Sequence, residues 1–338
     1  MSHRITLEGG GGFDVSAGED TLLRGALRAG VGFPYDCSVG GCGSCRFDLV
    51  SGEMETLWEE APGLSERDRR RGKRLACQSR PRSDCTIKVR PGEEYRPPVP
   101  PRRMTAVLVA RRAVTASMAE FVFRTAEPAH FIAGQYAVFR PPGAQGARAY
   151  SMSNLPNAEG EWRFVIRRVP GGRGSNAMFD ALAIGDTLDI DGPYGHAHFR
   201  ADAPRDVVCI AGGSGIGPVV SVAQAVVARA AAETSPGRRL FVFEGARTRG
   251  DLCFPALMGA AQEGVTAYTP VLSAEAEGSG WDGVRGFVHE EVERAVGAHA
   301  DQAEFYFAGP PPMTEALQKL LIVKWTVPIA HIHFDRFF

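Results

Sequence analysis

Hydrophobic positions in the first 95 residues alternate over short runs, a pattern typical of a small β-rich unit. Two apolar runs, residues 5–7 and 13–15, are separated by four glycines, and this arrangement predicts a β-hairpin with a loose turn. Apolar residues then recur at helical spacing over residues 22–27, and Gly30 should end this helix. Alternation returns over residues 86–90, which predicts a last strand.

A proline-rich segment separates this unit from the rest of the chain. Residues 95–103 read YRPPVPPRR, with four prolines in nine residues, and such a sequence favours an extended, semi-rigid spacer. We therefore expect a first domain over residues 1–95 and a linker over residues 96–103.

Beyond the linker the hydrophobic pattern changes once more. Residues 104–203 carry short β-like runs between turn residues, which predicts an antiparallel β-barrel or sandwich domain. In residues 204–338 apolar strands alternate with helical segments, which predicts a doubly wound α/β domain with a parallel sheet. In residues 104–203 the expected strands cover 106–110, 120–124, 137–140, 162–168 and 187–191. In residues 204–338 they cover 206–211, 240–244, 266–272 and 304–308.

Length and charge narrow the classes of protein that fit this pattern. A chain of 338 residues should form two or three domains. Lys plus Arg (38) nearly equal Asp plus Glu (39), which disfavours a general nucleic-acid binder. No apolar run approaches a membrane span of about 20 residues, and the first residues lack the apolar core of a signal peptide. We expect a cytoplasmic monomer that binds neither membrane nor nucleic acid.

Four of the seven cysteines form a spaced pattern. Residues 37–45 read CSVGGCGSC, and Cys77 follows after 31 further residues. The spacing C-x4-C-x2-C followed by a distant cysteine is that of plant-type [2Fe–2S] sites. The glycines of this loop would let backbone N–H groups approach the anionic cluster closely. The predicted iron ligands are Cys37, Cys42, Cys45 and Cys77.

Two alternatives to this ligand set stay open from the sequence. A zinc site would also use thiolates, although zinc loops favour two C-x2-C pairs. Cys85 competes with Cys77 as the fourth ligand, and we favour Cys77 because of its LACQS context. The remaining cysteines, Cys209 and Cys253, are expected to pack in the core.

A second motif, RAYSMSN at residues 148–154, fits a flavin site. A flavin needs a cation for its phosphate, an aromatic wall for its ring and a hydroxyl near its reactive nitrogen, and Arg148, Tyr150 and Ser151 offer these groups. In the downstream GGRGS segment, Gly172 and Ser175 can place donors on a pyrophosphate at a helix start. Taken alone, the motif would also fit an exposed hairpin.

A third motif, VVCIAGGSGIGP at residues 207–218, fits a nicotinamide dinucleotide. A hydrophobic strand enters a glycine-rich turn and then a helix of small residues, the arrangement that binds dinucleotide phosphates. A later strand ends in Gly309 and Pro310 at the carboxyl edge of the sheet, where ligands bind. The glycines assigned to the turn are Gly212, Gly213, Gly215 and Gly217.

Two further features bear on the nicotinamide site. Glu244 ends the next expected strand, where an acid favours NADH over NADPH, while Arg247 nearby favours the opposite. We expect NADH. The terminal aromatics Phe337 and Phe338 are candidates to cover the flavin ring and yield to nicotinamide. Alternation on a strand would put His331 and His333 on one face, and both are expected to pack rather than bind metal.

Together, CSVGGCGSC…LACQS, RAYSMSN, GGSGIGP and FAGPPPM resemble the ferredoxin–NADP-reductase-type oxidoreductases that carry an N-terminal plant-type ferredoxin domain. More narrowly, FPYDC, APGL, LACQ, RAYS and HFDRFF resemble the reductase components of toluene monooxygenases. This resemblance implies a β-grasp ferredoxin domain, FAD rather than FMN, and flavin contacts by the residues named above. One departure is Ala308, where many relatives have a cysteine before the Gly-Pro pair.

The reading that follows is an NADH:acceptor reductase that carries electrons from NADH through FAD and the [2Fe–2S] cluster. Its expected partner is the Rieske-type ferredoxin or the hydroxylase of a soluble diiron monooxygenase. A reductase for a Rieske ring-hydroxylating dioxygenase and a non-catalytic redox sensor are the alternatives. A basic strip over residues 67–74 would steer an acidic partner toward the cluster, or would simply be a solvated helix.

Overall fold

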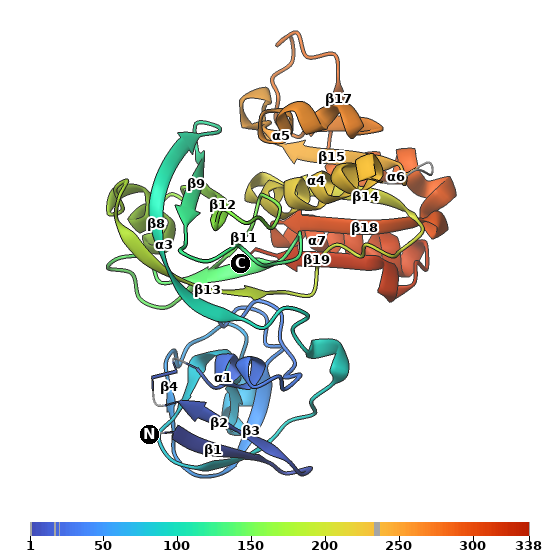
Figure 1. Ribbon diagram of the computed structural model, residues 1–338. Helices are drawn as coiled ribbons and strands as arrows, with labels where there is room; N and C mark the ends of the chain where they lie inside the picture. Colours follow the sequence, from blue (N-terminus) through green and yellow to red (C-terminus); the bar gives the residue numbers. More distant parts are fainter. Residues whose placement is uncertain (1, 17, 20, 233–236, 338) are drawn as a thin grey trace. The chain divides into compact units, whose positions relative to one another are not determined.

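The computed structural model describes every residue except 1, 17, 20, 233–236 and 338, and the chain forms two compact units (Figure 1). Two segments from the middle of the chain belong with the N-terminal residues rather than with their sequence neighbours. Unit 1 contains Met1–Met104, Ala137–Ala149 and Asp189–His196, and unit 2 contains Thr105–Tyr136, Tyr150–Leu188 and Ala197–Phe338. The domain borders expected from the sequence, at residues 95, 104 and 204, stay a proposal.

The N-terminal part of unit 1 is a five-stranded mixed sheet in the order β2-β1-β7-β3-β5. Strands β1 and β2 are antiparallel with Ile5 opposite Phe13, which confirms the predicted hairpin. Strand β7 pairs parallel to β1 and antiparallel to β3. The elements are β1 (Ser2–Leu7), β2 (Gly12–Ser16), α1 (Leu22–Arg28), β3 (Arg46–Ser51), β4 (Met54–Thr56), α2 (Glu66–Arg70), β5 (Lys73–Leu75), η1 (Ala76–Gln78), β6 (Ser79–Pro81), β7 (Cys85–Lys88) and η2 (Glu93–Tyr95).

Helix α1 forms where the apolar spacing predicted it and packs closely on strand β2. The Thr21 hydroxyl accepts a hydrogen bond from the Arg24 N–H and caps the helix. A Cβ atom at Gly25 would lie 2.9 Å from a Val15 methyl group, so only glycine allows this approach. The helix ends at Gly30, whose φ of 74° suits glycine.

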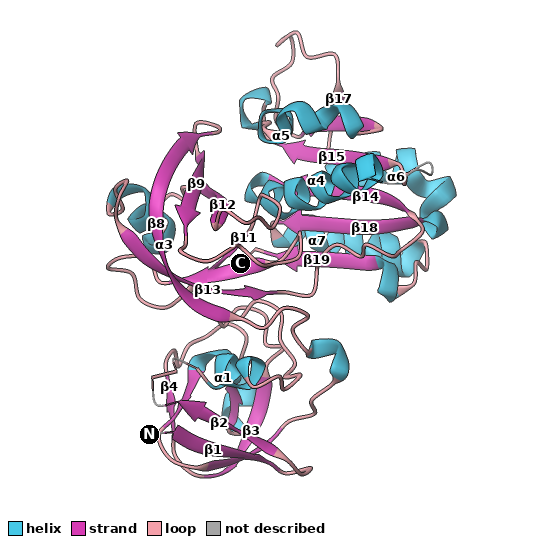
Figure 2. Cartoon of the chain, in the orientation of Figure 1, coloured by secondary structure: helices cyan, strands magenta, loops and turns pink. Residues whose placement is uncertain are grey.

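A second sheet has six strands in the order β11-β10-β13-β8-β9-β12, seen as magenta arrows in Figure 2. Strands β8, β9 and β12 are antiparallel neighbours. All five predicted strands are confirmed, whereas β11, which reads RAYS, was not predicted because it lacks a run of apolar positions. The elements are β8 (Arg102–Ala113), β9 (Met118–Arg124), β10 (Tyr136–Phe139), β11 (Arg148–Ser151), β12 (Glu161–Arg167), α3 (Arg173–Asp180) and β13 (Thr187–Tyr194). Strand β8 thus begins inside the expected linker.

The C-terminal part of unit 2 is a six-stranded parallel sheet in the order β17-β16-β15-β14-β18-β19. Its strands are β14 (Asp206–Gly212), β15 (Leu240–Ala246), β16 (Ala267–Leu272), β17 (Val284–Arg285), β18 (Ala303–Gly309) and β19 (Ile332–Arg336). The helices between them are α4 (Ile216–Ala232), α5 (Phe254–Met258), α6 (Val288–Val296) and α7 (Pro311–Gln318). Short helical turns complete this part: η3 (Gly213–Gly215), η4 (Arg249–Asp251), η5 (Gly259–Gly264), η6 (Gly297–Gln302), η7 (Lys319–Lys324) and η8 (Ile329–His331).

Helices cover both faces of the parallel sheet, as the doubly wound pattern predicted (Figure 1). Successive residues of the central strand β14 point to opposite faces. Val207, Cys209 and Ala211 pack with α4 and α5, while Val208 and Ile210 pack with α6 and α7. The continuous apolar run of this strand therefore reflects burial on both sides.

Helix α4 and the turn before it are strongly apolar. Among the described residues, Gly213–Ala232 is the one helical stretch long and apolar enough to cross a membrane. More than half of it is buried inside the protein, which is the burial of a core helix.

Candidate functional site

The four cysteines of the first motif lie together in unit 1 as two pairs of thiols. Cys37, Cys42 and Cys45 lie on the loop between α1 and β3, and Cys77 lies in the short turn η1. The Cys42 N–H donates to the Cys37 sulfur over 3.3 Å, and the Cys45 and Cys77 sulfurs are 3.4 Å apart. Two pairs suit a two-iron cluster in which each iron takes two thiolates.

The same loop offers hydrogen-bond donors and a tight backbone. The N–H groups of Cys37 and Ser44 both point at the Cys42 sulfur over 3.5 Å. Gly40 and Gly43 have φ values of 95° and 83°, and a Cβ at Gly43 would lie 2.5 Å from the Gly63 carbonyl oxygen. The residues present therefore fit an anionic cluster held close to the backbone.

Hydrogen bonds within each pair divide the protons unequally between the thiols. The hydrogen bond from Cys37 lowers the pKa of the Cys42 thiol to about 5. Hydrogen bonding to the partner thiol and burial raise the pKa of Cys37 and of Cys77. Because all four ligands bind iron as thiolates, loading the cluster would release the remaining protons.

The competing cysteine lies in a different environment. Cys85 is buried on strand β7, where its thiol donates to the carbonyl oxygens of Glu53 and Ser83 over 3.4 and 3.3 Å. Burial raises the pKa of this thiol. The hydrogen-bond partners of the Cys85 thiol are carbonyl groups, whereas the Cys77 thiol lies against Cys45. The geometry thus favours Cys77 as the fourth ligand.

Among the described residues, no group of three or more His, Cys, Asp or Glu side chains is arranged to hold a single metal ion. His333, which lies beside His331 in sequence, is instead buried on strand β19 and hydrogen-bonds through Nε2 to the Glu304 carboxylate at 2.7 Å. His331 lies before that strand, in the turn η8. The two histidines therefore do not share one strand face, which the alternation had suggested.

Trp58 was not singled out from the sequence, yet it covers the cysteine loop. A Cβ at Gly40 would lie 3.2 Å from the Trp58 ring, and this indole is 44% exposed. A lone aromatic in a loop has no spacing signal, so sequence patterns could not identify it.

The basic strip at residues 67–74 is only partly free. Arg70 pairs with Glu66, Lys73 pairs with Asp48, and Arg69 donates to the carbonyl oxygen of Ala61 over 3.0 Å. Exposed ion pairs of this kind contribute little to stability. The exposed side chain of Arg71 has no such pairing among the described contacts, and it is the better candidate for steering a partner.

The flavin motif forms strand β11 and the turn that follows it. The guanidinium of Arg148 donates to the carbonyl oxygens of Gln145 and Ala147 over 3.3 and 2.9 Å. Tyr150 is half-buried and Ser151 is buried.

One buried polar atom without a partner lies within this motif, and another lies just before strand β10. Among the described residues, the Gln135 amide nitrogen and the Ser153 hydroxyl are buried with no hydrogen-bond partner. An unpaired buried polar group is costly, so these atoms fit a site that a polar cofactor completes.

The second flavin segment leads into helix α3. Gly172 is the N-cap of this helix, and Gly171 before it has a φ of 71°. The Ser175 hydroxyl accepts from the Val169 N–H over 3.1 Å and so holds the turn closed. The free N–H groups of the first helical turn remain suited to a pyrophosphate.

The glycine-rich nucleotide turn crosses directly over the end of strand β18. A Cβ at Gly215 would lie 2.0 Å from the Ala308 carbonyl oxygen, and one at Gly212 would lie 2.6 Å from the Met313 sulfur. A Cβ at Gly309 would lie 2.6 Å from the methyl carbon of the same methionine. The structure therefore brings the glycine turn and the Gly309–Pro310 corner together at the carboxyl edge of the sheet, and Gly213, with a φ of 56°, lies in this turn.

Within unit 2 the flavin motif contacts the nucleotide turn. The Ser221 hydroxyl donates to the Asn154 carbonyl oxygen over 2.7 Å. A Cβ at Gly217 would lie 3.5 Å from the Ser151 carbonyl oxygen. The sites expected for hydride donor and hydride acceptor are thus adjacent.

Glu244 lies at the end of strand β15 but is buried, only 3% exposed. Its carboxylate accepts from the Cys253 and Phe254 N–H groups over 2.9 and 3.3 Å and from the Tyr268 hydroxyl over 2.5 Å. This carboxylate therefore stabilises the start of helix α5. Its contact with a ribose stays a prediction, and the exposed Arg247 follows directly after the strand.

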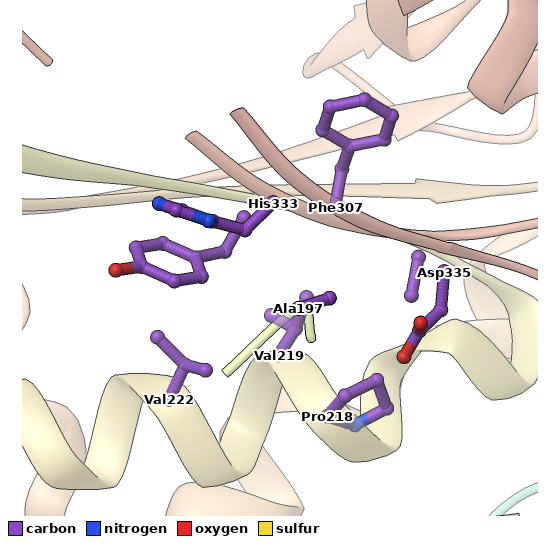
Figure 3. A pocket seen from close by; sticks show the side chains of 9 residues that line it. Ala197, Pro218, Val219, Val222, Phe307, His333 and Asp335 are labelled. Atoms are coloured by element: carbon purple, nitrogen blue, oxygen red, sulfur yellow. The ribbon is translucent and has the colours of Figure 1, made fainter. Parts of the chain in front are cut away.

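The C-terminal strand ends beside the nucleotide turn. The Phe337 N–H donates to the Gly309 carbonyl oxygen over 3.1 Å, which places this aromatic at the carboxyl edge. Phe338, the other aromatic candidate, lies outside the described residues. A small pocket lies between β19 and α4, and Figure 3 shows the Asp335 carboxylate pointing toward Pro218 there.

Three protein families match successive parts of the chain. They are described as a 2Fe-2S iron-sulfur cluster binding domain (residues 5–82), an oxidoreductase FAD-binding domain (residues 105–199) and an oxidoreductase NAD-binding domain (residues 209–319). The expected set of cofactors, a [2Fe–2S] cluster, FAD and a nicotinamide nucleotide, is confirmed.

Known reductases resemble the chain along its whole length. It is 39% identical to ferredoxin–NAD(P)⁺ reductase CarAd of Metapseudomonas resinovorans, over 99% of this chain and 100% of that protein. It is 38% identical to the ferredoxin–NAD⁺ reductase component of the alkene monooxygenase system of Xanthobacter autotrophicus, over 94% and 96% of the two chains. The solved structure of the ferredoxin reductase in carbazole 1,9a-dioxygenase matches with a TM-score of 0.92 and 34% identity, covering 100% of this chain and 99% of that one.

These relatives belong to systems of different kinds. The property common to the chain and these relatives is that of a reductase component of monooxygenase and dioxygenase systems. The narrower resemblance to toluene monooxygenase reductases is therefore not specific.

Proposed function

Because the chain belongs to the family of ferredoxin–NAD(P)⁺ reductases that serve oxygenase systems, we propose that it oxidises NADH and delivers electrons to the Rieske ferredoxin or hydroxylase of a soluble diiron monooxygenase. We assign that monooxygenase to the toluene, or aromatic, type. This choice of partner rests on the terminal HFDRFF and the other short strings described above.

The observation that carries the proposal is the contact between the flavin motif and the nucleotide turn. Ser221 of α4 holds the Asn154 carbonyl, and Gly217 leaves no side chain between α4 and the Ser151 backbone. Hydride transfer needs donor and acceptor atoms about 3–3.5 Å apart.

When bound, FAD would supply hydride chemistry and the [2Fe–2S] cluster would supply one-electron chemistry. The chain's residues bind and orient these groups. Arg148 offers a cation for the flavin phosphate, and a guanidinium forms strong charge-assisted bonds with phosphate. Tyr150 offers an aromatic wall, and Ser151 offers a hydroxyl near the reacting nitrogen. Two thiol pairs hold the cluster.

Nicotinamide choice follows from the end of strand β15. We propose NADH as the donor on the residue type alone: position 244 of strand β15, two residues before its end at Ala246, is an acid rather than a cation. The Glu244 carboxylate itself is bound to the start of helix α5. Arg247 is exposed directly after the strand and would favour a 2′-phosphate, so the relative kcat/KM for NADH and NADPH tests this choice.

A reductase for a Rieske dioxygenase is the second candidate. The similarity to the ferredoxin reductase in carbazole 1,9a-dioxygenase favours it. A non-catalytic redox sensor would bind the same cofactors without turnover.

One experiment separates the three possibilities. The purified holoprotein is mixed with NADH and, in parallel, with ferricyanide, with a diiron monooxygenase plus its Rieske ferredoxin, and with a Rieske dioxygenase plus its ferredoxin. The proposal requires rapid ferricyanide reduction and coupled hydroxylation by the diiron system. Coupling to the dioxygenase alone would select the second candidate. NADH that stays unoxidised with every acceptor would leave only the sensor.

A further inference from the structure

Unit 1 contains a buried ionic network that no step of the proposed reaction uses. Asp191, near the end of strand β13, lies 2.6 Å from the Arg28 guanidinium and 3.6 Å from that of Arg24. The Tyr194 hydroxyl donates to the same carboxylate over 2.8 Å. Arg24 and Asp191 are almost completely buried, with side-chain exposures of 2% and 8%.

Further charges extend this network across the helix. Glu19, just before α1, pairs with Arg28 and lies 3.4 Å from Arg103. The network therefore joins three cations to two carboxylates. Asp191 comes from more than 160 residues away in the sequence, so the charges on α1 are neutralised by a distant segment.

A second contact joins the same segment to the cysteine loop. Tyr35 is 1% exposed, and its hydroxyl accepts a hydrogen bond from the Gly195 N–H over 3.2 Å. The Tyr35 ring lies 4.5 Å from the His196 ring. Because Tyr35 precedes Cys37 by two residues, this contact is transmitted directly to the iron-ligand loop.

We propose that Arg24, Arg28, Tyr35 and Asp191 form a clasp that fixes the cluster loop against segment 189–196 of unit 1 and thereby holds the cluster in the geometry that electron transfer from the flavin requires. Strand β13 belongs to the sheet that carries the flavin motif. This inference rests on the proposed function, and its residues are positioning residues that touch neither cofactor.

The proline-rich spacer is the other part of the chain that could fix the position of the cluster. The proline-rich spacer is semi-rigid and limits the reach of the N-terminal fold without setting its orientation. Removing one partner of a buried ion pair leaves an uncompensated buried charge, which is strongly unfavourable. The contact therefore forms with all its partners or not at all, and it holds the cluster loop in one orientation against segment 189–196.

Four variants of the holoprotein test the clasp. Asp191→Asn removes the central charge at nearly constant shape, Tyr35→Phe removes only the hydroxyl that accepts from Gly195, and Arg28→Met removes one cation. Arg28→Lys keeps that charge and should restore most of the function. Glu8→Gln is the matched control, because it breaks an exposed pair with Lys88 in the same unit.

Two readouts are measured on each variant. Anaerobic stopped-flow follows flavin reduction by NADH and cluster reduction separately. Hydrogen exchange of the 189–196 backbone reports whether the segment has come loose, and it needs no turnover. We expect Asp191→Asn to leave flavin reduction unchanged and to slow cluster reduction by about tenfold, equivalent to 1.4 kcal/mol of lost docking free energy. Exchange near Gly195 should rise, while Glu8→Gln should behave like the wild type.

The proposal is wrong if exchange rises but cluster reduction keeps its rate, because the contact would then be only structural. It is also wrong if flavin and cluster reduction slow by the same factor. Should Asp191→Asn fail to fold, Tyr35→Phe decides the matter by the same two criteria. A wild-type cluster that NADH never reduces would instead refute the proposed function.

Discussion

Replacing Glu244 by alanine tests what the acid at the end of strand β15 does. The carboxylate accepts hydrogen bonds from two backbone N–H groups, those of Cys253 and Phe254, and from the Tyr268 hydroxyl. All three donors lose their acceptor in Glu244→Ala. Because the site is only 3% exposed, water cannot replace the carboxylate without opening the start of helix α5.

The magnitude follows from the three donors. A buried donor left without a partner costs about 1–3 kcal/mol, so three donors at the lower limit give a loss of about 3 kcal/mol. For a folding unit of this size, each kcal/mol lowers Tm by about 2–4 °C. We therefore expect the Tm of the nucleotide domain to fall by roughly 10 °C, measured by calorimetry or circular dichroism.

The nucleotide preference is the second half of this test. If Glu244 acts through structure, Glu244→Gln should lower Tm by less than alanine does and should leave the ratio of kcat/KM for NADH and NADPH unchanged. Arg247→Gln serves as the comparison, since its side chain is exposed at the same strand end. The reasoning would be refuted if Glu244→Gln kept its Tm but shifted the ratio about tenfold toward NADPH, equivalent to about 1.4 kcal/mol.

Four other predictions follow from the sites. Cys77→Ala should abolish the visible and EPR signals of the cluster, whereas Cys85→Ala should keep them; the opposite result would reassign the fourth ligand. Ser151→Ala should slow hydride transfer from NADH to the flavin by about tenfold, the effect of about 1.4 kcal/mol, and an unchanged stopped-flow rate would remove Ser151 from the mechanism. Burial lowers the pKa of His333 below its ordinary value of 6.5, despite its bond to a carboxylate. The unfolded state therefore binds more protons, and the free energy of unfolding should decline as pH falls below about 6.5. His333→Asn should flatten this decline, and a pH profile identical to that of the wild type would contradict the prediction. Arg71→Glu should slow electron transfer to a protein acceptor at low ionic strength but not ferricyanide reduction, and equal rates at all salt concentrations would make the strip a solvated surface.

Local signals explain which parts of the fold could be predicted. The hairpin of β1 and β2 and the helix α1 are encoded by residues next to one another, through the glycine turn and the Thr21 cap. Strand β14 shows its burial on both faces as a continuous apolar run. Strand β11 escaped prediction, because four residues that include an arginine and a serine carry too little alternation.

The candidate sites divide in the same way. The spacing of the cysteines identified a set that the structure gathers into two pairs, because the loop between Cys37 and Cys45 is short. The task of Glu244 could not be read from the strand, since its donors Cys253 and Phe254 lie beyond the next loop. A rule about acids at strand ends identifies the residue type but not the direction of the side chain.

Unit 1 is built from segments that lie far apart in the sequence. The sequence separates a cysteine domain from a flavin domain by a proline-rich segment, which suggests two bodies on a spacer. Within unit 1, Arg24 and Arg28 are neutralised by Asp191, which lies on a strand of the flavin sheet. Since an ion pair this deeply buried is unfavourable to break, the N-terminal fold and segment 189–196 should separate only by local unfolding. These charges therefore tie the N-terminal fold to segment 189–196 within unit 1.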